Sequence, residues 1–275
     1  MSDHCRVIAV CGHEAAHGEA LRGLVDPAVI VVPSGRELYR SVAGLTRRGE
    51  RGCVVPMTLG RDPELVADTA RTLGALPTAE RSGTVLARPF GTSQHLIGWL
   101  RAAAGRVPAT SALLVTAPSG DPFDDAELYR VASLVRRHGR HSSVEVAFSG
   151  GDPDPAEGVR RCRLLGATRV VLVPAAFALP QVPDGSGAHV ACAGPPVPPA
   201  ALARVLAERV ADAGRRWSER GDDGIATGLA AADGHGHSHT HPPGEEHDHV
   251  RGHGHPHPHQ HPHVHGAGRV IRSTV

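Results

Sequence analysis

Residues 6–13 read Arg-Val-Ile-Ala-Val-Cys-Gly-His, an apolar run that ends at a glycine and is followed by a histidine. The stretch from Val7 to Val10 has no polar position, which predicts a strand buried on both faces of a sheet. Gly12 allows the sharp turn that the chain needs where such a strand ends. Because open α/β sheets bind ligands at this edge, His13 is a candidate base or metal ligand held by rigid elements.

Three further strands and the intervening helices continue this pattern through residue 104. Apolar strands are predicted at 28–33, 52–57 and 84–89, and helices at 14–24, 35–48, 62–73 and 93–104. The third helix is marked by Asp62, a typical N-cap residue, and by a proline in the position after it. Alternating strands and helices predict a parallel sheet that is covered by helices on both faces.

The second part of the chain repeats the same order. Strands are predicted at 111–117, 143–148, 169–174 and 188–193, and helices at 124–137, 155–165 and 199–216. Ser119 lies 106 positions after His13, and Pro195 lies 106 positions after Pro89. Pro174 lies 118 positions after Pro56. Such similar offsets indicate an internal duplication, with chance similarity of alanine-rich α/β segments as the alternative. We therefore expect two similar α/β halves, at 1–106 and 107–220, that face each other across a cleft.

From residue 221 the composition changes to glycine, proline and histidine. The residues between the histidines give no apolar face, which predicts a disordered tail at 221–275. Neutral imidazole is a good ligand for divalent cobalt, nickel, copper and zinc, so the tail is predicted to bind metal. Its expected ligands are His235, His237, His239, His241, His247, His249, His253, His255, His257, His259, His261, His263 and His265.

The overall composition excludes several classes of partner. The formal net charge is +1 and aromatic residues make up 3%, so no basic surface for nucleic acid is expected. The sequence has no long apolar run and no signal-peptide pattern, which predicts a cytoplasmic protein without a membrane partner. The five cysteines are scattered without a Cys-x-x-Cys pair, so we expect small buried residues rather than disulfides or a cysteine zinc site.

Several motifs occur in an order that is typical of one family. They are a strand that ends in Gly12-His13, the turns Val54-Val55-Pro56-Met57-Thr58-Leu59-Gly60 and Arg88-Pro89-Phe90-Gly91, the duplication and the His-rich tail. Together, over residues 6–216 and the tail, they resemble the sirohydrochlorin cobaltochelatases of cobalamin biosynthesis. The resemblance implies two chelatase-like, flavodoxin-like halves and an ATP-independent lyase. Such an enzyme inserts a divalent metal into sirohydrochlorin without a nucleotide. Cobalt is the leading candidate metal, and nickel and iron are the alternatives. The resemblance further implies that His13 is a metal ligand and the base that removes pyrrole N–H protons.

The chain departs from that family at its second ligand. Family members carry another histidine where this chain has Gly60-Arg61-Asp62-Pro63, and often an acidic residue where it has Val31-Val32-Pro33. In the second half, Pro118-Ser119-Gly120 offers no counterpart of His13. His17 and Asp62 are the candidates to replace the missing ligand. The alternative function is a non-catalytic metal store or metallochaperone on a degenerate chelatase fold.

Two arginines are candidates for substrate binding. Arg61 and Arg88 follow strand ends on the predicted edge of His13. A guanidinium binds a carboxylate through two parallel hydrogen bonds, which suits a tetrapyrrole with several carboxylates. Ordinary surface charges are the alternative interpretation of both residues.

Other catalytic motifs fit less well. His13-Glu14-Ala15-Ala16-His17 also spells the His-Glu-x-x-His of zinc peptidases, but that motif lies within a long helix, whereas here a glycine precedes it and Gly18 follows. Ser119 lacks the Gly-x-Ser-x-Gly turn of serine hydrolases. A phosphate-binding loop that ends in Gly-Lys is excluded because the chain contains no lysine.

Overall fold

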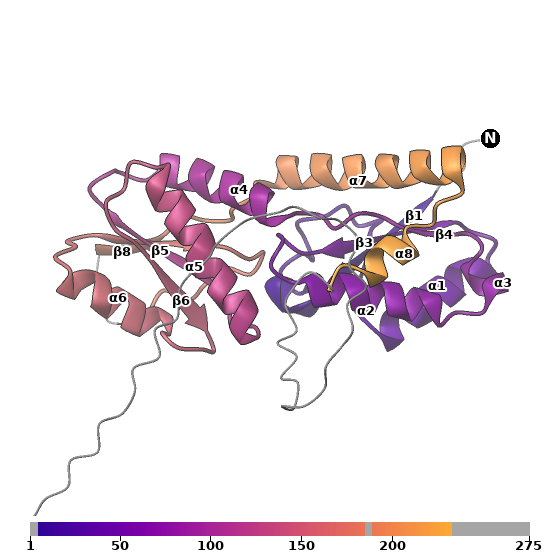
Figure 1. Cartoon of the computed structure of the whole chain (residues 1–275), viewed down its shortest axis with the longest axis horizontal. Helices are drawn as coiled ribbons and strands as arrows, with labels where there is room; N and C mark the ends of the chain where they lie inside the picture. The colour runs from indigo at the N-terminus through magenta and orange to yellow at the C-terminus, as the bar shows by residue number, and fades with distance from the viewer. Residues whose placement is uncertain (1–4, 185–188, 233–275) are drawn as a thin grey trace, which may run out of the picture. The chain divides into compact units, whose positions relative to one another are not determined.

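The structure, a computed structural model, describes residues 5–184 and 189–232, which form two four-stranded parallel sheets (Figure 1). The first sheet consists of β1 (Arg6–Cys11), β2 (Ile30–Pro33), β3 (Gly52–Met57) and β4 (Thr84–Leu86), in the order β2-β1-β3-β4. The second consists of β5 (Ala112–Pro118), β6 (Val144–Ser149), β7 (Val170–Pro174) and β8 (Val190–Cys192), in the order β6-β5-β7-β8. The strand order of the second sheet repeats that of the first. The predicted α/β fold with parallel sheets is confirmed.

Helices follow most strands, as expected. They are α1 (Arg36–Arg47), α2 (Pro63–Gly74), α3 (Thr78–Arg81), α4 (Ser93–Gly105), α5 (Pro122–Arg137), α6 (Pro155–Leu164), α7 (Pro199–Arg220) and α8 (Ile225–Leu229). Helices α2, α5 and α6 each begin at an Asp-Pro pair, in which the aspartate carboxylate accepts a hydrogen bond from a backbone N–H of the first turn. These caps explain why the starts of α2 and α6 could be predicted to within a residue.

The central strands of each sheet are buried on both faces, and alternate residues of such a strand enter different hydrophobic cores. In β1, Ile8 and Val10 pack into a core with α1 and α2, whereas Ala9 and Cys11 enter a larger core. That larger core also contains Leu113 of β5 and buried residues of the second sheet. The two halves therefore share one hydrophobic core and are stabilised together.

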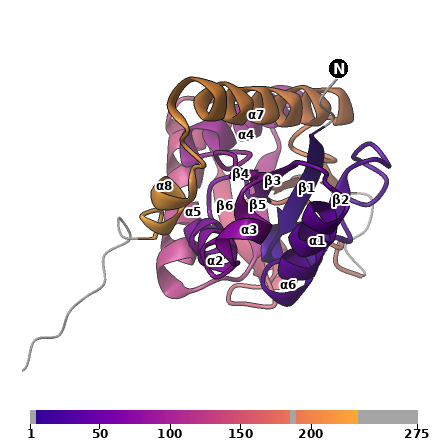
Figure 2. The same cartoon turned by 90° about the vertical axis from the view of Figure 1, so that its right-hand side faces the viewer.

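The last helix of each half packs on the other half. Helix α4 follows β4 in the chain but contacts α5 and β7, and α7 follows β8 but contacts β3 and β4. Both helices lie along the same side of the molecule, at the top of Figures 1 and 2. The guanidinium of Arg216 on α7 donates to the carbonyl of Leu86 at 2.9 Å, and Arg209 donates to the carbonyl of Phe90 at 3.1 Å. The predicted boundary at 106/107 thus separates two segments that complete each other's cores.

Ordered structure extends beyond residue 220, where the tail was expected to begin. Helix α8 packs against α2, and the backbone N–H of Leu86 donates to the carbonyl of Asp223 at 2.8 Å. Residues 221–232 are therefore part of the fold rather than of the tail. The remainder of the expected tail, 233–275 with its thirteen histidines, lies outside the described residues.

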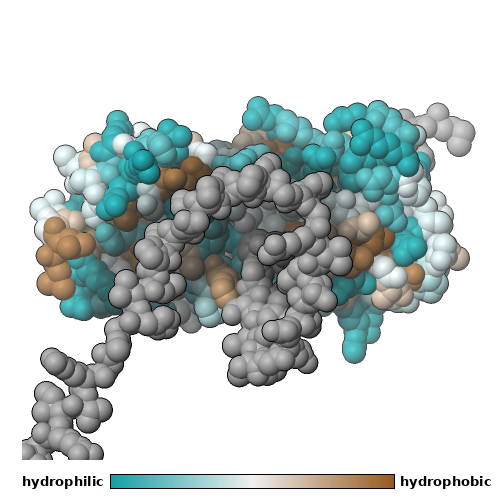
Figure 3. Space-filling view, in the orientation of Figure 1, coloured by the Kyte–Doolittle hydropathy of each residue, from teal (hydrophilic) through white to brown (hydrophobic). Residues whose placement is uncertain are grey.

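None of the five cysteines, which all lie in the described ranges, forms a disulfide, and three of them, Cys11, Cys53 and Cys162, are buried as expected. Cys5 is exposed and Cys192 is half-buried, so the prediction of burial is wrong for these two. Across 5–184 and 189–232, no helix has the length and apolar character needed to cross a bilayer. In the view of Figure 3, the visible apolar patches of this part of the chain are small and separated by hydrophilic surface.

Candidate active site

The segment after β1 is a short 3-10 helix, η1 (His13–Gly18), and not the α-helix expected at 14–24. Ala16 and His17 adopt left-handed backbone angles, with φ of 47° and 52°. The backbone N–H groups of Ala15 and His17 both donate to the carbonyl of Gly12, at 3.2 and 2.9 Å, which closes the turn tightly. Because the zinc-peptidase alternative requires both histidines on one face of an α-helix, this backbone removes it.

Glu14 is fully buried and holds the loop that follows β3. Its carboxylate accepts hydrogen bonds from the Thr58 hydroxyl at 3.1 Å, the Leu59 N–H at 2.5 Å and the Arg61 N–H at 3.1 Å. Burial raises the pKa of Glu14, and the charge of Arg61 acts in the opposite direction. These contacts explain why the alanine-rich segment does not continue as a helix, since a regular helix would carry Glu14 away from the loop.

His13 and Asp62 form the pair at the centre of the site. Asp62 Oδ2 lies 3.1 Å from His13 Nδ1, while Oδ1 accepts the Leu65 N–H at 2.8 Å as the N-cap of α2. A carboxylate can only accept, so Nδ1 carries the proton and donates it. The hydrogen bond raises the pKa of His13, and burial opposes this rise. A Cβ at Gly12 would collide with Asp62 Oδ2, which explains the glycine at this position.

The other ring nitrogen of His13 is the distinctive feature of the pair. Nε2 is buried and has no hydrogen-bond partner in the described part of the chain, although 27% of the side chain is exposed. With Nδ1–H fixed on Asp62, Nε2 carries the lone pair in the neutral ring. It is therefore available to bind a cation or to accept a proton.

Arg61 lies under the surface, so the alternative interpretation of an ordinary surface charge is wrong for this residue. Its side chain is completely buried, and Nη2 donates to the Asp124 carbonyl at 3.3 Å and to Asp125 Oδ1 at 3.4 Å. Nε and Nη1 have no partner among the described residues. Arg61 thus connects the loop after β3 to the start of α5 in the second half, with part of its donor capacity unused.

The charges around this arginine are predominantly negative. Three carboxyl groups interact with the charge of this guanidinium: those of Glu14, Asp124 and Asp125. Burial, followed by the Asp121 charge, raises the pKa of Asp124 to about 6, and the charge of Arg61 opposes it. Asp124 and Asp125 were not among the expected site residues, because an acidic first turn is typical of any helix start.

The remaining expected site residues lie apart from the His13–Asp62 pair. His17 is exposed on η1, and Arg88, 64% exposed, faces Asp212 of α7 at 3.7 Å. Within 5–184 and 189–232, no three or more His, Cys, Asp or Glu side chains are grouped to hold a metal ion. The structure therefore brings together His13, Asp62 and Arg61 but neither His17 nor Arg88.

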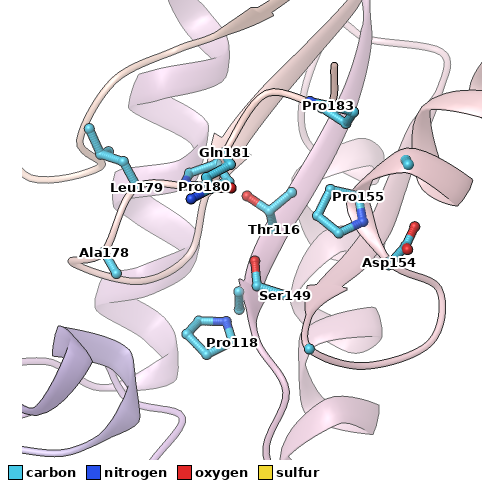
Figure 4. Close-up of a pocket in the computed structure, with 13 residues that line it drawn as sticks. Thr116, Pro118, Ser149, Asp154, Pro155, Ala178, Leu179, Pro180, Gln181 and Pro183 are labelled. Atoms are coloured by element: carbon cyan, nitrogen blue, oxygen red, sulfur yellow. The ribbon is translucent and has the colours of Figure 1, made fainter. Parts of the chain in front are cut away.

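A cavity of about 510 Å³ lies at the carboxyl ends of β5 and β6, beside the loop that follows β7 (Figure 4). The buried Thr116 hydroxyl has no partner among the described residues, and Figure 4 shows Thr116 between the loop of Pro180 and the helix start at Pro155. None of the expected site residues lines this cavity. It borders the first half through Ala178, whose N–H donates to the carbonyl of Glu14 at 3.1 Å.

These features define a duplicated parallel α/β protein with a His–Asp pair at the carboxyl edge of its first sheet. Comparison with known protein families gives no match. Comparison with curated proteins gives no match either.

The chain is similar in fold to several solved structures, of which two are described here. One is described as SirB from Bacillus subtilis with Fe3+; it is 16% identical, with a TM-score of 0.49, and the match covers 80% of this chain and 100% of that one. The other is a multi-domain protein from Deinococcus radiodurans, described as structurally similar to chelatases with two additional novel domains. It is 20% identical, with a TM-score of 0.45, and the match covers 81% of this chain and 58% of that one. At such identities the likeness concerns the fold alone.

Proposed function

We propose that this chain is an ATP-independent chelatase that inserts a divalent metal into a tetrapyrrole. Sirohydrochlorin is the proposed substrate and cobalt the proposed metal, with nickel and iron as the next candidates, in cobalamin or related tetrapyrrole biosynthesis in the cytoplasm. The observation that carries the proposal is the buried, unpartnered Nε2 of His13, whose ring is held by Asp62.

Metal insertion requires few chemical steps. Two pyrrole N–H bonds break, their electron pairs become metal–nitrogen bonds, and two protons leave; no electron is transferred and no nucleotide is consumed. Neutral His13 can hold the incoming cation at Nε2 and, once the metal has passed to the macrocycle, accept a departing proton there. Asp62 supports both roles, because a carboxylate on the far ring nitrogen fixes the tautomer and increases the basicity of Nε2.

The surrounding charge favours a cation at this place. The carboxyl groups near His13 outnumber the one guanidinium, and they act in a partly buried region where screening by water is weak. A divalent metal beside Nε2 would offset this excess negative charge. The His-rich segment is proposed to collect the metal and raise its local concentration.

Arg61 is proposed to receive a carboxylate of the macrocycle. Its Nε and Nη1 groups are buried and unpartnered within the described ranges, which is a costly state for a guanidinium. A substrate carboxylate would satisfy them through the paired geometry that arginine prefers. This role requires that the covering segments move when the substrate binds.

The direct test is an absorbance assay of sirohydrochlorin with purified protein and Co2+, Ni2+ or Fe2+ in separate reactions. We expect a metal-dependent spectral change faster than the spontaneous reaction, with cobalt giving the highest kcat/KM. Full metal binding by the protein without any acceleration over the spontaneous rate would contradict the proposal and support a metal store or metallochaperone. Faster insertion of nickel or iron than of cobalt would contradict the metal assignment alone.

A further inference from the structure

Another cavity, of about 470 Å³, lies beside β4, the edge strand of the first sheet. Its wall is formed by α2, the end of β4, the last turns of α7, and α8 with the segment that leads into it. Figure 1 shows that segment running from the end of α7 past β4. Arg88, Arg216 and Arg220 line the cavity, and Asp222 is the only carboxylate among the described residues that do. The lining therefore carries an excess of positive charge.

Arg216 supplies a fixed positive charge to this wall. Its side chain is 12% exposed, Nη1 donates to Asp222 Oδ2 at 3.0 Å, and Nη2 donates to the Leu86 carbonyl at 2.9 Å. Its Nε is buried and has no hydrogen-bond partner in the part of the chain that the structure describes. Because two hydrogen bonds hold this guanidinium in place, little conformational entropy is lost there when a ligand binds.

Arg88 and Arg220 differ from Arg216, because their guanidinium groups are exposed and form no hydrogen bond with described residues. Arg88 is 64% exposed, and its Nε lies 3.7 Å from Asp212 Oδ2, which is beyond hydrogen-bond distance. The guanidinium of Arg220 forms neither a hydrogen bond nor an ion pair with any residue of 5–184 and 189–232. Both arginines can therefore offer N–H donors to a ligand in the cavity.

The carboxylates that contact these arginines do not neutralise them. Asp212 is shared by three guanidinium groups at 3.4 to 3.7 Å, those of Arg88, Arg215 and Arg216. Asp222 uses one oxygen for Arg216 and the other for a backbone N–H at 2.8 Å. Like charges that line one cavity repel one another, and an anion bound between them offsets this repulsion.

We propose that this cavity is a binding site for a small polyanion, which Arg88 and Arg220 bind through phosphate or carboxylate groups beside the fixed charge of Arg216. A guanidinium presents two parallel N–H donors that match either group, so the chemistry of recognition is the same for both. A volume of about 470 Å³ lies within the range of small-molecule sites. The lining residues do not include His13 or Asp62, and the inference does not rest on the proposed function.

The test is isothermal titration calorimetry of the full-length, metal-free chain with sodium pyrophosphate and, separately, with sodium citrate. A pH of about 8 keeps most histidines neutral, so that the histidine-rich segment attracts few anions. The variants are Arg88→Gln and Arg220→Gln, with Arg215→Gln as the matched control. Arg215 is an exposed arginine of α7 and contacts Asp212 as Arg88 does, but it does not line the cavity.

We expect the unmodified chain to bind one of the two probes with a Kd of about 100 µM or lower. Arg88→Gln and Arg220→Gln should each weaken that binding by about tenfold or more, because each removes charge-assisted hydrogen bonds. Arg215→Gln should change it by less than about twofold, since an exposed charge outside the cavity is screened. Tighter binding of pyrophosphate would indicate a phosphorylated ligand, and tighter binding of citrate would indicate a polycarboxylate.

Absence of saturable binding of both probes to the unmodified chain would overturn the inference. Equal losses of affinity in all three variants would also overturn it, because binding would then follow net charge rather than the cavity. Unchanged affinity in Arg88→Gln and Arg220→Gln would place the anion elsewhere on the chain. Metal insertion is not measured in this experiment, so its failure leaves the chelatase proposal intact.

Discussion

At the residue scale, the site depends on which ring nitrogens of His13 form hydrogen bonds. The proximity of His13 and Asp62 follows from the sequence, because both come after neighbouring parallel strands whose carboxyl ends meet at one edge. The unpartnered state of Nε2 does not follow from it, since this depends on how η1 turns the ring. The hydrogen bonds to the Glu14 carboxylate and the burial of Arg61 could not be predicted from the sequence either, because they depend on contacts between segments more than 40 positions apart.

A stability measurement tests the His13–Asp62 contact in the apo protein. The hydrogen bond to Asp62 raises the pKa of His13 in the folded state above the unfolded value of about 6.5. A raised pKa means that the charged histidine stabilises the fold fully below pH 6.5, and that this contribution disappears as the pH rises through the folded pKa. We expect the unfolding free energy of the unmodified chain, relative to His13→Ala, to be larger at pH 5.5 than at pH 9. A difference that is independent of pH, measured by denaturant titration, would show that the contact is absent.

At the element scale, the strands were predictable and the segment after β1 was not. Strands that are buried on both faces leave continuous apolar runs, and Asp-Pro pairs mark helix starts, so both signals are local. The helix expected at 14–24 rested on alanine propensity, which is a weak preference. Contacts of Glu14 with the loop after β3 outweigh that preference and leave the short turn η1.

Removal of the Glu14 carboxylate should therefore loosen the loop after β3. Glu14→Ala leaves three buried donors, from Thr58, Leu59 and Arg61, without an acceptor. We expect a loss of about 3 kcal/mol or more in unfolding free energy, measured by urea denaturation, and faster amide exchange at Leu59 and Arg61. Glu14→Gln is the matched control, because its carbonyl oxygen keeps one acceptor and it should cost less. Unchanged exchange at Leu59 in Glu14→Ala would contradict the structural role of Glu14.

At the scale of the whole molecule, the duplication can be predicted from the sequence. The packing of α4 and α7, each on the half to which it does not belong in the chain, cannot. Offsets between motifs reveal two similar halves, whereas no local signal tells on which sheet an amphipathic helix packs. Because α4 and α7 each cover the other half, a shared core forms and the boundary at 106/107 does not separate two independent folds. The same arrangement positions the start of α5 beside Arg61 and so brings the second half to the site.

Truncations test where the fold ends. A chain cut after residue 232 keeps α8, and its thermal midpoint should stay within about 2 °C of the full chain, because the removed segment has no apolar face. A chain cut after residue 220 loses α8, including the buried Ile225 and the bond from Leu86 to Asp223. We expect its midpoint to fall by about 4 °C or more. Equal midpoints for the two truncated chains in calorimetry would show that α8 adds nothing to the fold.

The central claim is that His13 carries metal insertion, and the most direct test compares the unmodified chain with His13→Ala in one assay. Co2+-dependent spectral change of sirohydrochlorin is followed at buffered free Co2+, with total bound Co2+ and the thermal midpoint measured on the same samples. We predict a rate at least about 100-fold lower for His13→Ala, with bound Co2+ nearly unchanged because the thirteen histidines from 235 to 265 are intact. Insertion by His13→Ala at the unmodified rate would contradict the account.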